Sequence, residues 1–137
     1  MGVSLHPAAV HTASDVDAAM KRVLAERPQA ILLLTSPVVF RVLARIAELA
    51  LQSRTPSISP FSVYPAAGGR MAYGPDFPPM WGQLVGYIDR ILRGARVGDL
   101  PIERPAKFKL VVNLKAAKLL GLTLPQSLVL RADEVIQ

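Results

Sequence analysis

Cysteine is absent from the 137 residues, which excludes disulfides, thiol chemistry and cysteine-ligated zinc. Long hydrophobic runs are also absent: the longest, Ala30–Leu34 and its flank, is strand-sized, whereas a bilayer-spanning helix needs about 20 apolar residues. The start, MGVSLHPAAVH, lacks the basic flank and apolar core of a secretory signal. The chain as written therefore predicts no signal peptide, and the lack of cysteine is compatible with either the cytoplasm or the periplasm.

Catalytic side chains are sparse. The only two histidines, His6 and His11, are five apart on an expected strand and so point to opposite faces, which prevents a shared metal site. None of the serines lies in a G-x-S-x-G elbow, and GGRMAYG lacks the G-K-[ST] ending of a phosphate loop. The sequence therefore predicts a protein that is not an enzyme and holds no metal or cofactor.

The formal net charge of +6 raises the question of nucleic-acid binding. Basic residues are spread singly along the chain, and apolar neighbours dilute the tightest groups, which are Arg90/Arg93/Arg96 and Lys107/Lys109/Lys115/Lys118. Nucleic-acid binders concentrate such charge on one face with interleaved aromatic residues. We interpret the charge as a solvated surface and expect no nucleic-acid partner; the opposite hypothesis predicts a steeply salt-dependent affinity for DNA.

Hydrophobic periodicity predicts alternating strands and helices. The expected strands are Leu5–His11, Ala30–Thr35, Ser57–Pro60, Arg70–Tyr73 and Phe108–Val112. The expected helices are Asp15–Glu26, Pro37–Ser53, Phe77–Arg93, Leu114–Leu120 and Pro125–Leu130. Short connections in this order favour a right-handed parallel α/β layer. The continuous apolar run AILLLT is typical of a parallel strand covered on both faces.

Helix boundaries carry recognisable signals. Ser14 and Ser36 are expected N-caps, and Pro37 suits the first helical position after Ser36. Asn113 is placed to cap the following helix, and Gly94 lies where a C-terminal cap glycine belongs. These residues predict where the backbone leaves and enters the helices.

The stretch Phe61–Asp76, FSVYPAAGGRMAYGPD, is the strongest candidate for a ligand site. It combines three aromatic rings with prolines and a glycine pair, on a rigid loop after a strand. In open parallel sheets, ligands bind at the carboxyl edge of the strands, where helix N-termini also gather. The candidate ligand-binding residues are Ser36, Pro37, Phe61, Tyr64, Tyr73, Gly74 and Asp76. The simpler alternatives are that Ser36 is only a cap, that the tyrosines belong to the core, and that the stretch only connects two elements.

The segments GGRMAYGPDFPPMW, YIDRILRG, LPIERPAKF, NLKAAKLLG and RADEVIQ closely resemble the C-terminal part of ABC transporter substrate-binding proteins. The subgroup is the one that includes tryptophan- and tyrosine-type binding proteins. The resemblance extends upstream through DVDAAM, AILLLTSP and RIAELA, and so covers nearly the whole chain. Arg70 and Ala72 replace the leucine and serine usual in the glycine motif, which removes an expected serine contact to the ligand; Pro78-Pro79 and Gly82 are also unusual.

The resemblance implies the fold: a Rossmann-like three-layer parallel sheet, forming an incomplete C-terminal lobe of a type I periplasmic binding protein. Residues 1–63 and 107–137 would be second-lobe elements. Residues 64–106 would be a crossover segment whose helix normally packs on the first lobe, which this chain lacks. We therefore predict that Phe77–Leu92, with its complete apolar stripe, folds back on the partial lobe or packs against a second copy, giving a homodimer.

The resemblance also implies function. The expected role is the solute-binding component of an ABC-type importer, in which two lobes close on a small amino-acid-like or carboxylate-bearing ligand. The implied partner is an ABC permease in the membrane, and the implied location is periplasmic or extracellular and lipid-anchored. The alternative is a stand-alone α/β regulatory or protein-interaction domain without a transport role. A first lobe and signal encoded upstream would favour the former, and a genuine start at Met1 would favour the latter.

Overall fold

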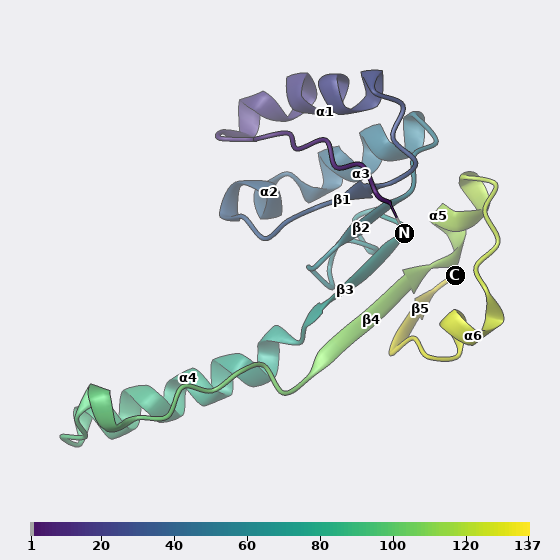
Figure 1. The fold of residues 1–137 in the computed structure, drawn as a ribbon. Coiled ribbons are helices and arrows are strands. Elements are labelled where there is room, and N and C mark those ends of the chain that lie inside the picture. Colours follow the sequence, from purple (N-terminus) through teal and green to yellow (C-terminus); the bar gives the residue numbers. More distant parts are fainter. Residues whose placement is uncertain (1) are drawn as a thin grey trace.

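The computed structural model describes residues 2–137 and is built on one five-stranded sheet in the order β1-β2-β3-β4-β5 (Figure 1). The strands are β1 Ile31–Leu32, β2 Ser57–Ser59, β3 Met71–Pro75, β4 Phe108–Asn113 and β5 Glu134–Ile136. Strands β1, β2 and β3 run parallel, β4 is antiparallel to β3, and β5 is parallel to β4. The predicted α/β class is confirmed, and the predicted parallel sheet is parallel in every pair except the antiparallel pair of β3 and β4.

Two helical groups cover opposite faces of this sheet. On one face, α1 Val16–Ala25, α2 Pro37–Arg41 and α3 Leu43–Gln52 enclose a core with Leu33. On the other, α5 Leu114–Leu119 and α6 Gln126–Val129 enclose a core with Met71 and Val112. Leu32, Ile58, Met71 and Val112 are neighbours in register across β1, β2, β3 and β4, so their side chains lie on the same face of the sheet. Leu33 follows Leu32 in the chain and therefore lies on the opposite face. The result is the expected three-layer arrangement.

Capping residues place the helix starts largely as predicted. The Ser36 hydroxyl accepts a hydrogen bond from the Val39 N–H, with Pro37 at the first helical position, and the Asn113 side chain accepts one from the Ala116 N–H. Ser14 is not a cap: it lies in the short 3-10 helix Ala13–Asp15, where Asp15 accepts a bond from the Thr12 N–H. The expected helix Pro37–Ser53 is two helices, because Val42 leaves helical geometry between them.

Strand β1 is more exposed than its apolar sequence predicts. Leu33 is buried, but Leu32 and Leu34 are 62% and 71% exposed. Among residues 2–137, no helix lies over β1 on the face of Leu32 and no strand pairs with its outer edge. The prediction that this strand is covered on both faces is wrong for this reason.

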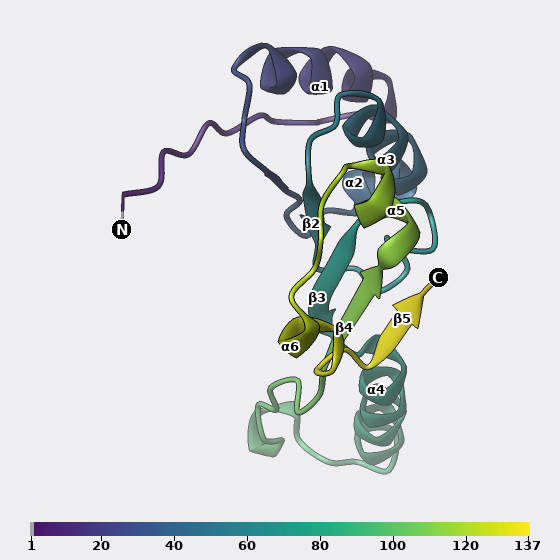
Figure 2. The same cartoon turned by 90° about the vertical axis from the view of Figure 1, so that its right-hand side faces the viewer.

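The predicted strand Leu5–His11 does not form. Residues 2–11 have no regular structure and are largely exposed, with Leu5 81% accessible. Figure 2 shows this segment running away from the sheet toward the N-terminus. A strand needs a neighbour to accept its hydrogen bonds, and Pro7 also removes one donor, so local sequence alone does not hold the segment in the sheet.

Helix α4 Phe77–Leu92 projects away from the sheet between β3 and β4 (Figure 1). Gly94 follows the end of the helix and has φ +95°, as expected of a C-terminal cap glycine. No residue of α4 is buried, and Trp81 and Leu92 are 62% and 81% exposed. Only Phe77, at the start of α4, packs against the core, and the β3–β4 pair carries the rest of the helix outward. Of the two predicted outcomes for this helix, folding back on the rest of the chain is therefore wrong, and packing against a second copy stays a prediction.

The return path from α4 runs beside it. The 3-10 helix η2 Val97–Asp99 is followed by the extended stretch 100–107. The Tyr87 hydroxyl donates a 2.7 Å hydrogen bond to the Pro101 carbonyl, which ties this stretch to the helix. Within residues 2–137, no helix has the length and apolar character needed to cross a membrane.

Candidate functional site

The carboxyl ends of the parallel strands β1, β2 and β3 lie on one side of the sheet, which is called the edge below. Predicted site residues follow each of these strand ends. Ser36 comes after β1, Phe61 after β2, and Asp76 after β3. Register pairs Leu32 with Ile58 and Ser59 with Ala72, so β1 and β2 end close together, whereas β3 continues beyond Ala72 to Pro75. The topology therefore brings together residues that are 40 positions apart in the sequence, as expected of a ligand-binding edge.

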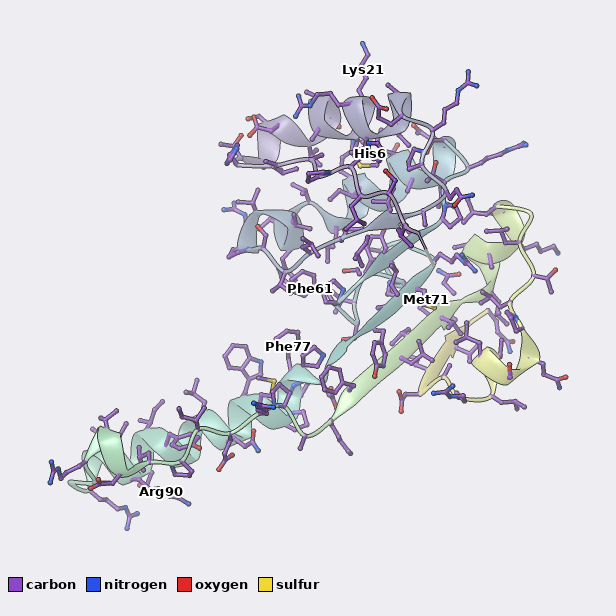
Figure 3. All side chains as sticks on the ribbon, viewed as in Figure 1. His6, Lys21, Phe61, Met71, Phe77 and Arg90 are labelled. Carbon is purple, nitrogen blue, oxygen red and sulfur yellow. The ribbon has the colours of Figure 1, made fainter. Side chains whose placement is uncertain are left out.

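An aromatic cluster, defined here as Phe40, Phe61 and Phe77, joins these elements. The ring centroids of Phe40 and Phe61 are 5.0 Å apart in an edge-on arrangement, and those of Phe61 and Phe77 are 6.2 Å apart and stacked. Phe61 is buried, whereas Phe40 is about half exposed. Figure 3 labels Phe61 and Phe77, which lie where the sheet meets the base of α4. The cluster presents apolar ring surface at the edge of the strands.

A second aromatic pair lies on the other face of the sheet. Tyr73 stacks on Phe108 with ring centroids 5.7 Å apart, and both rings are about half exposed. Tyr73 lies on the face of Met71, two residues earlier in the same strand, whereas Phe61 belongs to the core of the opposite face. The predicted residues Tyr73 and Phe61 therefore do not meet directly.

Gly74 is needed for the shape of the edge. A Cβ atom at this position would collide with the backbone of Pro60, including its carbonyl oxygen. The chain that follows β2 thus crosses closely over β3, and it carries Phe61 to its place beside Phe77. Gly74 contributes close backbone approach rather than a ligand contact of its own.

Tyr64 belongs to the core. Its side chain is fully buried, and its hydroxyl is 2.6 Å from the Ser57 hydroxyl. Ser57 begins β2, so the phenol points toward the opposite edge of the sheet from Ser36 and Asp76. Burial raises the pKa of Tyr64, opposed by the hydrogen bond with Ser57. The residue is out of reach of a ligand at the edge in this conformation.

Asp76 connects the sheet to α4. Its N–H donates a 3.0 Å hydrogen bond to the Lys107 carbonyl, which extends the β3–β4 ladder by one step. The nearby ammonium of Lys109 is held by Glu134 at 2.8 Å. That hydrogen bond is the main cause of a raised pKa for Lys109, to which the charge of Asp76 adds. The extended ladder therefore holds the Asp76 carboxylate just beyond the end of β3.

A hollow lies elsewhere. It is an open groove of about 530 Å³ lined mainly by Leu114, Leu122, Leu124 and Val129, between α5 and α6. Its lining is predominantly apolar and includes no acidic residue. No group of three metal-binding side chains gathers anywhere in the described part of the chain.

Sequence reasoning identified the edge but missed some of its rings. The sequence predicts Phe77 only as part of the apolar stripe and Phe108 only as part of a strand, and it does not single out Phe40. Phe77 begins α4 and Phe108 begins β4, whereas Phe40 lies within α2. The position of Phe77 and Phe108 at element starts was a signal that could have grouped them with Phe61 and Tyr73.

The sequence matches the model of the family described as ABC transporter substrate binding protein over residues 1–136. No protein among those with curated descriptions matches significantly. Among solved structures, a conserved domain protein from Vibrio cholerae O1 biovar El Tor is 27% identical, with a TM-score of 0.85 over 92% of this chain and 42% of that one.

Two further solved structures share the fold. The ABC domain in complex with L-Trp from Streptococcus pneumoniae is 22% identical, with a TM-score of 0.88 over 98% of this chain and 46% of that one. A substrate binding protein with adhesive properties from Clostridium difficile, in its ligand-free, open form, is 18% identical, with a TM-score of 0.62 over 93% of this chain and 42% of that one. The chain spans less than half the length of each of these structures.

Proposed function

Because the chain belongs to the ABC transporter substrate binding protein family, we propose that it forms one lobe of a solute trap for an ABC importer. The solute is a small amino-acid-like molecule with an apolar or aromatic body. It lies against the edge where β1, β2 and β3 end, and the aromatic cluster packs on its apolar part. Binding occurs without catalysis.

The observation that carries this proposal is the convergence of Ser36, Phe61 and Asp76 at one strand edge, beside the aromatic cluster. Buried ring surface there supplies favourable transfer of an apolar group from water, and a few polar groups around it provide orientation. A structurally similar protein with bound L-Trp supports an amino acid as the solute. Tyr73, on the other face, is proposed only as a flanking contact.

The mechanism is closure of two lobes. A solute that contacts both lobes favours the closed state by its differential affinity, and the closed shape is read by a membrane permease. The exposed stripe of α4 supports this arrangement, because its side chains remain in water unless a second surface covers them. We propose that the opposing lobe covers this stripe in the two-lobed protein, and that a second copy covers it when the chain is alone. The location that this role implies is periplasmic or extracellular.

Binding of L-tryptophan to the 137-residue chain tests the proposal. One lobe makes only part of the contacts, so we expect weak, saturable binding detected by titration in amide NMR spectra. Phe61→Ala should weaken it, whereas Leu122→Ala, in the groove between α5 and α6, should leave it unchanged. Saturable binding that Leu122→Ala abolishes and Phe61→Ala spares would place the site in the groove and contradict the proposal.

A further inference from the structure

We propose that Asp76 binds the positively charged group of the solute, so that the site selects molecules carrying an ammonium beside an aromatic body. This assignment rests on the proposed function and names the charge that the edge recognises. The carboxylate of Asp76 and the aromatic cluster together form the recognition surface.

The first argument is that Asp76 occupies an N-cap position without acting as a cap. An N-cap carboxylate normally accepts a hydrogen bond from the N–H of the second or third helical residue. In α4 these residues are Pro78 and Pro79, which have no N–H. The Asp76 side chain accordingly makes no capping hydrogen bond. The usual reason for an aspartate at this position is therefore absent.

The second argument is that the neighbouring cations are engaged elsewhere. Lys109, which is close enough for the charge of Asp76 to influence it, is hydrogen-bonded to Glu134. The ion pairs found among residues 2–137 are formed by Arg45, Arg93 and Lys109 with other carboxylates, and none includes Asp76. A carboxylate that is neither a cap nor half of an ion pair is available to a ligand.

The third argument is position. Alternation along β3 and its extension puts Asp76 on the side of Gly74, which is the side where Pro60 passes over the strand and leads to Phe61. Phe77, whose ring stacks on Phe61, is the next residue. Cations are attracted both to carboxylates and to aromatic faces within about 6 Å. The juxtaposition therefore fits an ammonium close to an aromatic or apolar body.

Three related probes separate the two charges of an amino acid. L-tryptophan carries both, tryptamine lacks the carboxylate, and indole-3-propionate lacks the ammonium. The experiment titrates each into the full 137-residue chain and follows amide NMR shifts. We expect L-tryptophan and tryptamine to bind and indole-3-propionate to bind at least tenfold more weakly, as expected for loss of a hydrogen bond to a charged group.

Substitutions at Asp76 test whether its carboxylate causes the preference for probes that carry an ammonium. Asp76→Asn should weaken L-tryptophan and tryptamine about tenfold and abolish the preference over indole-3-propionate. Asp76→Glu should retain most of the preference. The control is Glu26→Gln, the same change of charge on an exposed residue at the end of α1, which should leave all three affinities unchanged.

The outcomes distinguish the assignment from the function on which it rests. Equal binding of indole-3-propionate, or unchanged affinities in Asp76→Asn, would overturn the role of Asp76 while leaving solute binding at the edge intact. Failure of all three probes to bind the unmodified chain would overturn the proposed function, and the assignment with it.

Discussion

Gly74 shows how one residue determines the geometry of the edge. The carbonyl of Pro60 occupies the space where any other residue would place its Cβ atom. Backbone cannot move aside as a flexible side chain does, so the close crossing of the two chain segments depends on glycine. Through this crossing, Gly74 positions Phe61 without touching a ligand.

We predict that Gly74→Ala destabilises the protein by about 1–3 kcal/mol, the usual cost of overpacking. Urea denaturation followed by circular dichroism measures the change. Gly82→Ala is the matched control, because a Cβ atom there has no neighbour within 4 Å and alanine gains about 1 kcal/mol in a helix. Equal stability of Gly74→Ala and the unmodified chain would show that the crossing is looser than described.

Tyr64 has a structural role that can be separated from ligand binding. Tyr64→Phe removes the hydroxyl and leaves that of Ser57 buried without its partner. We expect a loss of about 1–3 kcal/mol in the free energy of unfolding and no change in affinity for the solute. The double variant with Ser57→Ala should recover part of the stability. A loss of solute affinity in folded Tyr64→Phe would return this residue to the site.

The ion pair between Arg45 and Asp17 gives a pH-dependent prediction. The hydrogen bond from Arg45 lowers the pKa of the Asp17 carboxyl below its unfolded value, which is about 3.9. The pair thus stabilises the fold above the unfolded pKa, and this contribution disappears as the pH falls through the lower folded value. Asp17→Asn should lower the urea midpoint slightly at pH 7, and the difference from the unmodified chain should vanish toward pH 2. A difference of equal size at both pH values would mean that the pair does not act through charge.

At the scale of elements, local sequence signals predicted most of the helices and strands. They did not predict elements whose formation depends on contacts with distant segments of the chain. The caps Ser36 and Asn113 and the glycine at position 94 act within one element, so the sequence predicted them correctly. Strand β5 was not predicted: its three residues are held by parallel pairing with β4, through contacts such as Val112 with Val135. Pairing across about 20 residues leaves no local pattern in the short segment.

Dependence on distant neighbours also explains two wrong predictions, and it explains why the sequence predicted only part of the candidate site. Leu5–His11 and the covering of Leu32 both require neighbours that residues 2–137 do not supply. The edge was predictable because strand ends of a parallel sheet gather together, whereas Phe40 and Phe61 are 21 residues apart in the sequence, and their ring contact depends on how α2 packs beside the segment after β2. The division of the chain at residues 63/64 and 106/107 stays a prediction; in this structure the projecting segment begins after Pro75.

Helix α4 yields the prediction at this scale. Ile88 is about half exposed in the middle of the stripe, so Ile88→Lys should leave the thermal stability of the dilute chain unchanged. It should, however, abolish concentration-dependent association and the accompanying blue shift of Trp81 fluorescence. Gln83→Lys, on the polar side of the helix, is the control and should associate normally. A chain that stays monomeric at every concentration, with Trp81 fully hydrated, would contradict packing of this face against a second copy.

At the scale of the whole molecule, this protein is an α/β lobe with an exposed helix beside the edge that we propose as the ligand site. The edge carries the rings of the aromatic cluster and the carboxylate of Asp76, and α4 has an exposed apolar face. Both features lie at the same end of the sheet, next to β3 and β4. A surface that packs on α4 therefore lies near the edge and can complete the site there, as lobe closure requires.

The most direct measurement of this account is a crystal structure of the chain grown with L-tryptophan. We predict density for the solute at the ends of β1, β2 and β3, with its ring against Phe61 and Phe77 and its ammonium within hydrogen-bonding distance of Asp76. Density in the groove between α5 and α6, with the strand edge covered by the chain's own residues, would contradict the central claim that this edge recognises the solute.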